Sequence, residues 1–298
     1  CGARELMHHG TLIHLSSLDP CAMPELPEVE VVCRQLSPLL AGQSLQGVGT
    51  SGKSLRSFSG RPQGLSPLLG QSVRGLTRRA KNLLLVFDHH QLALHLGMSG
   101  VLSWCPGRDS PPKQSVHEHL WLVFDRGLLL YTDPRRFGDA RLIDGDEAPS
   151  RALGVGSSGL EPLEASFNGE ALTRAAQGVR QAVKVWLMRG DVVVGVGNIY
   201  ASEALHRAGI HPARAAGRIR PERLARLVHH IKEVLEEAIR EGGSTLRDFK
   251  DAAGVHGGYG ERHRVYGRAG QPCLSCGTHI RRMVQAQRAT YYCHVCQR

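Results

Sequence analysis

The chain has 298 residues, a length that suits about two domains of roughly 150 residues each. Hydrophobic residues make up 41% and charged residues 21%, which is a globular composition and excludes a chain that is disordered throughout. Lysine and arginine total 37 against 27 acidic residues, so the formal net charge of +10 favours a polyanionic partner such as nucleic acid. The longest uninterrupted apolar runs, such as Leu83 to Phe87, have five residues where a membrane-spanning helix needs about 20, so we expect no membrane partner.

Residues 1–22 hold only a short apolar patch and one arginine, which is poor material for a secretory signal. We expect this segment to be an upstream extension that is absent from the mature protein, with Met23 as the initiator. Of the eight cysteines, four are scattered and four form two tight pairs near the end of the chain. That usage is typical of a reducing compartment, so we expect a cytoplasmic protein.

The first predicted element is an amphipathic helix after Pro27, with acidic residues at its start and apolar residues at helical spacing. From Gly42 to Ile143 short apolar runs alternate with glycine and charged turns, which predicts antiparallel strands in a sandwich or barrel. The predicted strands are 83–87, 92–96, 120–124, 128–131 and 140–143. A linker rich in Gly, Ser and Pro follows at 146–159.

Helical patterns begin after Pro162. The clearest predicted helix spans Glu222 to Glu241, where apolar residues line one face, Pro221 precedes the helix and Gly242 ends it. Residues 254–260 form a glycine-rich loop, and a small separate module begins at Cys273.

Four cysteines in that module predict a structural zinc site. Cys273-x-x-Cys276 is followed, after sixteen residues, by Cys293-x-x-Cys296. Paired knuckles of this kind supply four thiolates to a tetrahedral zinc ion, and a module of under about forty residues forms no stable core without such help. The alternative, a redox dithiol, needs one such pair beside a βαβ unit. Arginines between the knuckles indicate a zinc-stabilised hairpin that presents guanidinium groups to DNA phosphates.

A nucleotide hydrolase is a rival hypothesis, because residues 47–54 match the phosphate-loop pattern G-x-x-x-x-G-K-[ST]. Such a loop needs a helix directly after it, whose N-terminus holds the phosphates. Gly60, Pro62, Gly64 and Pro67 exclude a helix of useful length there. A dinucleotide fingerprint at Gly195-x-Gly197 is also rejected, because Tyr200 stands where glycine or alanine is required. We therefore expect neither a nucleotide nor a redox cofactor.

Six motifs occur in order along the chain and resemble those of bacterial formamidopyrimidine-DNA glycosylases, a family shared with endonuclease VIII. They are Pro24 to Glu30 (PELPEVE), Arg78 to Lys81 (RRAK), His95 to Gly100 (HLGMSG), Thr132 to Gly138 (TDPRRFG), Gly195 to Glu203 (GVGNIYASE) and Gln287 to Cys293 (QRATYYC). The resemblance covers residues 23–298. It implies an α+β multidomain fold: an N-terminal antiparallel β-sandwich with flanking helices at 23–145, the linker at 146–159, a helix, two turns, helix domain with a lesion-capping loop at 160–262, and a zinc finger at 263–298.

The resemblance also implies a monomeric base-excision repair enzyme. It would excise oxidised purines, such as 8-oxoguanine and formamidopyrimidines, from duplex DNA and then cleave the abasic strand by β,δ-elimination. In this family the nucleophile is an N-terminal proline amine, here Pro24, and Glu25 shuttles protons beside it. Lys81 matches the residue assigned to β-elimination, and Arg288 the residue assigned to δ-elimination. Because a proline nitrogen within the chain is an amide, this chemistry requires that Pro24 be the first residue.

The resemblance implies DNA contacts as well. Met98, Arg135 and Phe137 would fill the gap that the extruded nucleotide leaves. Backbone contacts would come from His117, Arg180 and Asn198, with added charge from Lys184, and Glu203 would lie near the lesion pocket. The length of the 254–260 loop favours an enzyme for oxidised purines. One alternative is an endonuclease VIII-like enzyme for oxidised pyrimidines. The other is a lesion-binding protein without catalysis, if Pro24 is blocked. The sequence departs from the family pattern at His263, a position at which members of the family commonly have an apolar residue.

Overall fold

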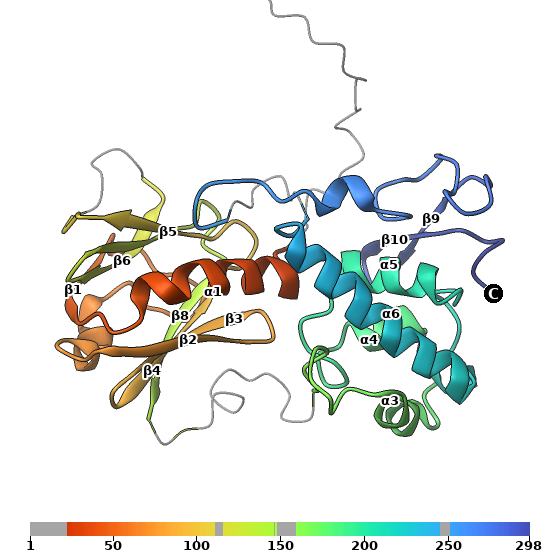
Figure 1. Ribbon diagram of the computed structural model, residues 1–298, viewed down its shortest axis with the longest axis horizontal. Helices are drawn as coiled ribbons and strands as arrows, with labels where there is room; N and C mark the ends of the chain where they lie inside the picture. Colours follow the sequence, from red (N-terminus) through yellow and green to blue (C-terminus); the bar gives the residue numbers. More distant parts are fainter. Residues whose placement is uncertain (1–22, 111–115, 146, 148–158, 245–250) are drawn as a thin grey trace, which may run out of the picture.

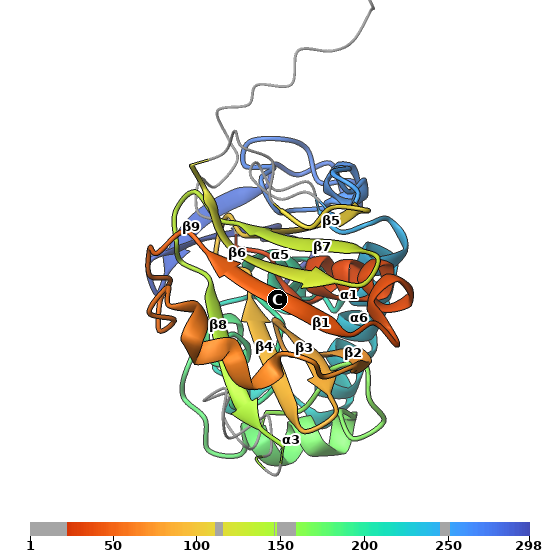
Figure 2. The same cartoon turned by 90° about the vertical axis from the view of Figure 1, so that its left-hand side faces the viewer.

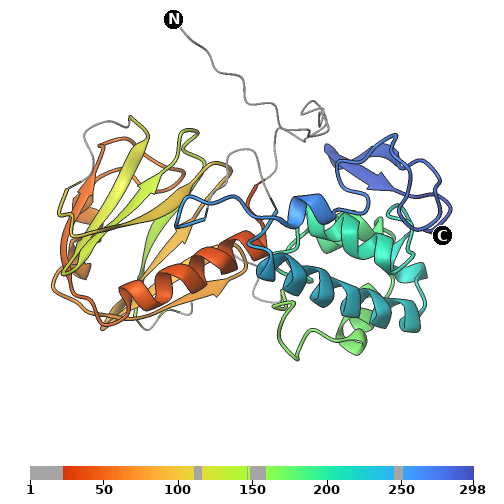
Figure 3. The ribbon, with the colours of Figure 1, turned by 45° about the horizontal axis from the view of Figure 1, so that its top comes forward.

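A β-rich lobe and a helical lobe make up the computed structural model, which describes residues 23–110, 116–145, 147, 159–244 and 251–298 (Figure 1). Helix α1 (Leu26–Leu40) begins against the helical lobe and runs along the β-rich one, an arrangement that Figure 3 shows with the top of the molecule turned forward. No described helix is long and apolar enough to span a bilayer. The predicted linker at 146–159 lies outside the described residues except at its two described positions, 147 and 159.

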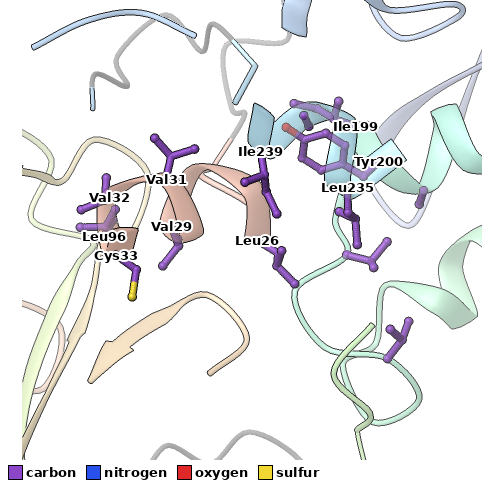
Figure 4. Close-up of a cluster of buried hydrophobic side chains, with 14 of the residues drawn as sticks. Leu26, Val29, Val31, Val32, Cys33, Leu96, Ile199, Tyr200, Leu235 and Ile239 are labelled. Carbon is purple, nitrogen blue, oxygen red and sulfur yellow. The ribbon is translucent and has the colours of Figure 1, made fainter. Parts of the chain in front are cut away.

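Helix α1 packs against both lobes, and nine of its residues are buried. Pro27 lies in the first turn, where its missing N–H costs nothing, and Glu28 adds a negative charge at the positive end of the helix. In Figure 4, Leu26 lies beside Ile239 of the helical lobe, whereas Val32 and Cys33 lie toward the β-rich lobe. The predicted helix is confirmed, and it joins the cores of the two lobes.

The β-rich lobe is a sandwich of two four-stranded antiparallel sheets, as predicted (Figure 2). One sheet has the order β1 (Leu45–Thr50), β6 (Glu118–Phe124), β7 (Gly127–Thr132), β5 (Val101–Pro106). The other has the order β2 (Val73–Arg79), β3 (Asn82–Phe87), β4 (His90–His95), β8 (Asp139–Asp144). The five predicted strands are confirmed as β3, β4, β6, β7 and β8.

The sequence analysis missed three strands. Strand β2 carries three arginines, and β5 ends in a proline. Strand β1 contains two glycines, and the ring of Trp121 lies over one of them: a Cβ on Gly49 would stand 2.0 Å from the indole nitrogen. The rejected phosphate loop therefore begins as a sheet strand, and among the described residues the next helical turn is the 3₁₀ helix η2 (Pro62–Leu68).

The helical lobe consists of α3 (Gly169–Ala176), α4 (Val183–Leu187), α5 (Asn198–Arg207) and α6 (Pro221–Arg240), with short 3₁₀ turns η3 (Ala216–Arg218) and η4 (Tyr259–Arg262). The helix predicted over 222–241 is confirmed as α6, whose apolar face packs on α3 and α5. The chain from α5 through two turns to α6 forms the expected helix, two turns, helix arrangement. Strands β9 (Arg281–Gln285) and β10 (Arg288–Tyr292) form the C-terminal hairpin, and β10 packs on α5.

Candidate functional site

The carboxylate of Glu25 sits at the N-terminus of α5. It accepts hydrogen bonds from the backbone N–H groups of Gly197 (2.8 Å), Ile199 (3.0 Å) and Tyr200 (3.4 Å). These are N–H groups that a helix leaves unpaired in its first turn, where the helix dipole also favours a negative charge. A Cβ on Gly197 would stand 2.3 Å from the carboxyl carbon of Glu25, so only glycine fits there. The Gly195-x-Gly197 motif, rejected as a dinucleotide fingerprint, thus leads into the N-terminus of α5 that binds the Glu25 carboxylate. We call this N-terminus the seat of Glu25.

A second carboxylate, Glu28, holds the start of α1 from the other side. It is fully buried and accepts hydrogen bonds from the backbone N–H of Glu25 (2.9 Å), the hydroxyl of Tyr200 (2.5 Å) and the backbone N–H of Ser244 (2.7 Å). Burial raises the pKa of this carboxyl, and the hydrogen bonds partly offset the increase. Pro24, which precedes these residues, is buried. In this chain its nitrogen forms an amide with Met23.

Lys81 is the second residue of the tight turn that joins β2 to β3. That turn is held by Glu161, which accepts hydrogen bonds from the backbone N–H of Ala80 (2.6 Å) and from the guanidinium of Arg78 (2.8 Å). Burial lowers the pKa of Lys81, the charge of Glu25 opposes that shift, and the charge of Arg288 adds to it. Glu25 and Arg288 therefore both lie within electrostatic reach of Lys81, although the three residues come from distant parts of the sequence.

Arg288 is exposed at the start of β10, directly after the hairpin turn. The two turn residues, Ala286 and Gln287, both have positive φ (46° and 61°), as a two-residue hairpin turn of the primed type requires. The hairpin turn thus fixes the position of Arg288, whose charge reaches Lys81.

Two of the residues predicted to fill the DNA gap, Arg135 and Phe137, lie on a loop that Asp133 organises, and Met98 lies on the turn between β4 and β5. Asp133 is fully buried and accepts hydrogen bonds from the Ser99 hydroxyl (2.6 Å) and from the backbone N–H of Gly138 (2.8 Å). The Phe137 ring is 45% exposed, and the Arg135 guanidinium lies 5.0 Å from its centre. A Cβ on Gly97, the residue before Met98, would stand 2.4 Å from the backbone of this loop, so the two turns are in direct contact.

The other predicted DNA contacts occupy different environments. His117 and Arg180 are exposed. Asn198 is largely buried, and its amide donates to the carbonyl of Ala289 (3.0 Å). The prediction that Lys184 adds surface charge is wrong: Lys184 is 1% exposed and donates to Asn198 (2.5 Å) and to the Thr290 hydroxyl (2.7 Å).

Glu203 has a structural environment that the sequence does not reveal. It is fully buried, and its carboxylate accepts hydrogen bonds from the backbone N–H groups of three consecutive residues, Arg264, Val265 and Tyr266, at 2.8–3.0 Å. The residue therefore fixes the chain that leads from η4 into the zinc finger.

Three anchoring residues, Glu28, Asp133 and Glu161, were missed as functional candidates. Glu28 and Asp133 lie inside motifs that carry the family resemblance, so membership of a motif could have marked them as candidates. Glu161 has no such signal, because it follows the linker and reaches back to a turn that is 81 residues earlier in the sequence.

The four cysteines of the C-terminal module form one cluster, with ligand atoms that all lie within 4.8 Å of one another. The sulfur atoms of Cys273 and Cys296 are 3.9 Å apart, and those of Cys276 and Cys293 are 3.5 Å apart. Four thiolates at about 2.3 Å from a tetrahedral zinc ion would be about 3.8 Å from one another. The donor set and spacing therefore fit a structural zinc ion.

Comparison with known protein families gives three consecutive matches. Residues 23–140 match the formamidopyrimidine-DNA glycosylase N-terminal domain, residues 158–250 the H2TH domain of the same enzymes, and residues 270–298 the zinc finger found in FPG and IleRS. A formamidopyrimidine-DNA glycosylase of Aromatoleum aromaticum is 47% identical over 277 residues, which are 93% of this chain and 100% of that protein. The chain belongs to the formamidopyrimidine-DNA glycosylase family.

Solved structures of the family share the fold. The MutM (FPG) protein of Thermus thermophilus aligns with a TM-score of 0.80 at 35% identity, covering 92% of this chain and 98% of the other. The Lactococcus lactis Fpg in complex with DNA that contains an abasic site aligns with a TM-score of 0.82 at 32% identity, covering 92% and 99%. The resemblance and fold class predicted from the sequence are therefore confirmed.

Proposed function

We propose that the protein is a DNA glycosylase and abasic-site lyase that removes oxidised purines, 8-oxoguanine and formamidopyrimidines, from duplex DNA. The observation that carries this proposal is the binding of the Glu25 carboxylate to the first turn of α5, next to Pro24 in the chain and within electrostatic reach of Lys81, which the charge of Arg288 also reaches. Relatives named formamidopyrimidine-DNA glycosylase and a Lactococcus lactis relative solved with Fapy-dG DNA support the substrate class.

In this mechanism the amine of an N-terminal Pro24 attacks C1′ of the damaged nucleotide. The C1′–N bond forms as the glycosidic bond breaks, the base leaves with a proton, and the sugar ring opens to an iminium ion. Glu25, the carboxylate next to the nucleophile, accepts the proton that the attacking amine loses and passes it to the ring oxygen, while the departing base takes its own proton from water. The amine requires that Pro24 begin the active chain, so residues 1–23 must be absent from the active enzyme.

The following eliminations use Lys81 and Arg288. The iminium ion acidifies the C2′ proton, and a lysine amine whose pKa is lowered by burial is suited to accept that proton. Loss of the 3′ phosphate completes β-elimination. Loss of the 5′ phosphate then completes δ-elimination, and the exposed guanidinium of Arg288 stabilises the departing phosphate.

The remaining side chains would bind the DNA. Phe137 and Met98 would occupy the space of the extruded nucleotide, while Arg135 would hydrogen-bond the orphaned partner base. His117, Arg180 and Asn198 would contact the phosphate backbone. The net charge of +10 would strengthen binding of the negatively charged duplex as a whole. We also propose that the enzyme acts as a monomer on the bacterial nucleoid, with one zinc ion as its cofactor.

We propose that the chain is organised around these roles. Residues 23–145 form the catalytic domain, 146–159 the linker, 160–262 the DNA-binding domain with its lesion-capping loop, and 263–298 the zinc finger. Cys273, Cys276, Cys293 and Cys296 would hold the zinc, whose contribution is structural: it fixes the hairpin that carries Arg288.

Borohydride trapping on abasic duplex DNA tests the mechanism. A chain that begins at Pro24 should form a reduced covalent adduct through that residue, and the same chain with Pro24 acetylated should form none. Failure of the unblocked chain to cross-link would contradict the catalytic proposal and leave a lesion-binding protein. Faster excision of thymine glycol than of 8-oxoguanine would instead favour an enzyme of the endonuclease VIII type.

A further inference from the structure

A buried histidine of α5 faces the cysteine cluster. His206 lies in the last turn of α5 and is 4% exposed, and its Nε2 atom is 3.6 Å from the sulfur of Cys273. Its other ring nitrogen, Nδ1, is buried without a hydrogen-bond partner in the described parts of the chain. The sulfur of a metal-binding cysteine is thus the polar atom against which this ring is oriented.

This environment selects one tautomer of the ring. A neutral imidazole has one N–H donor and one bare acceptor nitrogen. A proton on Nδ1 would bury a donor without an acceptor and would also aim the lone pair of Nε2 at a negatively charged thiolate. A proton on Nε2 avoids both costs, because the N–H then points at the sulfur and the bare Nδ1 lies in the interior.

Other contacts join the same end of α5 to the second cysteine knuckle. The side chain of Gln297 donates to the carbonyl of Ile210 (2.9 Å) and accepts from the backbone N–H of Cys293 (2.8 Å). The backbone N–H of Arg298 donates to the carbonyl of Gly209 (3.0 Å). The second knuckle is therefore held through backbone and amide groups, whereas His206 reaches the first knuckle at a metal ligand itself.

We propose that His206 is a positioning residue of the zinc centre, which donates an Nε2–H hydrogen bond to the Cys273 thiolate. Hydrogen bonds to a metal-bound sulfur disperse its negative charge, hold the ligand in place and slow loss of the metal. The contact also links the zinc ligand to α5, whose opposite end forms the seat of Glu25. This inference rests on the zinc ion of the proposed function and is independent of the glycosylase chemistry.

Zinc release from the full-length, zinc-loaded protein into excess EDTA tests the hydrogen bond. His206→Phe keeps a planar ring but removes the donor, and it should release zinc about tenfold faster than the unmodified protein. His206→Gln restores a donor and should release zinc at less than about threefold the unmodified rate. His229→Phe, a change at an exposed histidine of α6, is the control and should match the unmodified protein. Equal release from the His206→Phe variant and the unmodified protein would overturn the proposal.

A measurement on the unmodified protein keeps the test independent of how the variants fold. Long-range ¹H–¹⁵N spectra of the zinc-loaded protein distinguish the two imidazole tautomers, and we expect the His206 proton on Nε2. A proton on Nδ1 would overturn the hydrogen bond while leaving the zinc site intact. A protein purified without zinc would overturn the zinc site itself, and with it this inference.

Discussion

Gly197 and Glu25 are in such close contact that the carboxylate of Glu25 occupies the space that a side chain at position 197 would need. A Cβ at position 197 would stand 2.3 Å from the carboxyl carbon and 2.4 Å from Oε1 of Glu25. Gly197→Ala should therefore displace Glu25 from the first turn of α5 and reduce borohydride trapping by at least about tenfold, since small misplacements of a catalytic group have large effects.

The matched control for this substitution is Gly64→Ala. Nothing lies within 4 Å of the position that a Cβ would occupy at Gly64, so this variant should trap abasic DNA at the unmodified rate. If Gly197→Ala retains normal trapping in a chain that begins at Pro24, the seat of Glu25 on α5 has no catalytic importance.

The ion pairs of Glu161 should contribute to stability more than an exposed pair does. Glu161 and Arg78 are 6% and 8% exposed, and Glu161 also accepts the backbone N–H of Ala80. Removing one partner of a buried pair costs about 3–5 kcal/mol, so Glu161→Ala should lower the free energy of unfolding by an amount of that order. Glu170→Ala breaks a pair with Arg174 whose side chains are 80% and 68% exposed, and it should cost less than about 0.5 kcal/mol. Urea unfolding of both variants measures the difference, and equal costs would contradict the role given to Glu161.

Glu161 also illustrates what the sequence could and could not predict. The cysteine spacing, helix α6 and five strands follow from local patterns of residues, and the catalytic candidates follow from motifs that the chain carries intact. The burial of Lys184, the backbone contacts of Glu203 and the clamp formed by Glu161 depend on residues 60 or more positions away. Local patterns carry no information on such distant partners. Strands β1 and β2 were missed for the same reason, since their glycines and arginines make sense only beside Trp121 and Glu161.

His95 should make the protein less stable in mild acid. Burial lowers its imidazole pKa to about 4 from an ordinary value of 6.5, and its Nδ1 accepts the backbone N–H of Gly97 (2.9 Å). The unfolded chain therefore binds a proton more readily than the folded one between these two values. The stabilisation is fully present above about pH 6.5 and is lost progressively as the pH falls toward 4, by up to about 3 kcal/mol.

Urea unfolding at a series of pH values measures this loss, and His95→Gln provides the comparison. The glutamine amide oxygen can accept the Gly97 N–H but does not titrate, so this variant should lose less stability between pH 6.5 and 4. His89→Gln, at an exposed histidine, should leave the pH dependence unchanged. The argument fails if His95→Gln and the unmodified protein lose equal stability over this range.

Phe137 should matter for lesion processing and little for folding. Its ring is 45% exposed on the loop that Asp133 holds, so Phe137→Ala should change the free energy of unfolding by no more than about 0.5 kcal/mol. Unstacking a paired nucleotide costs a few kcal/mol, and the Phe137 ring offsets part of this cost by filling the space that the nucleotide leaves. Phe137→Ala removes that compensation. We expect excision of 8-oxoguanine from duplex DNA to slow by at least about tenfold, a change equivalent to about 1.4 kcal/mol.

Leu69→Ala is the control for that experiment, because Leu69 is equally exposed, at 47%, but follows η2 in the β-rich lobe outside the proposed DNA contacts. Single-turnover excision and thermal unfolding should both remain unchanged in this variant. An equal loss of excision in the two variants would show that exposed apolar area, and not a wedge at Phe137, governs the rate.

Zinc removal should disorganise the C-terminal hairpin and weaken DNA binding. The hairpin has two strands of five residues, and an isolated hairpin of this size is marginally stable at best, so its fold depends on the cysteine cluster. Cys293→Ser should lose zinc and bind duplex DNA with a smaller dependence on salt, because the arginines of the hairpin no longer engage phosphates. Cys105→Ser, at a partly buried cysteine of β5, should retain zinc and the full salt dependence. Metal analysis measures the zinc content of each variant, and DNA titrations at several salt concentrations measure the salt dependence of binding. An undiminished salt dependence in zinc-free Cys293→Ser protein would contradict a role of the hairpin in DNA binding.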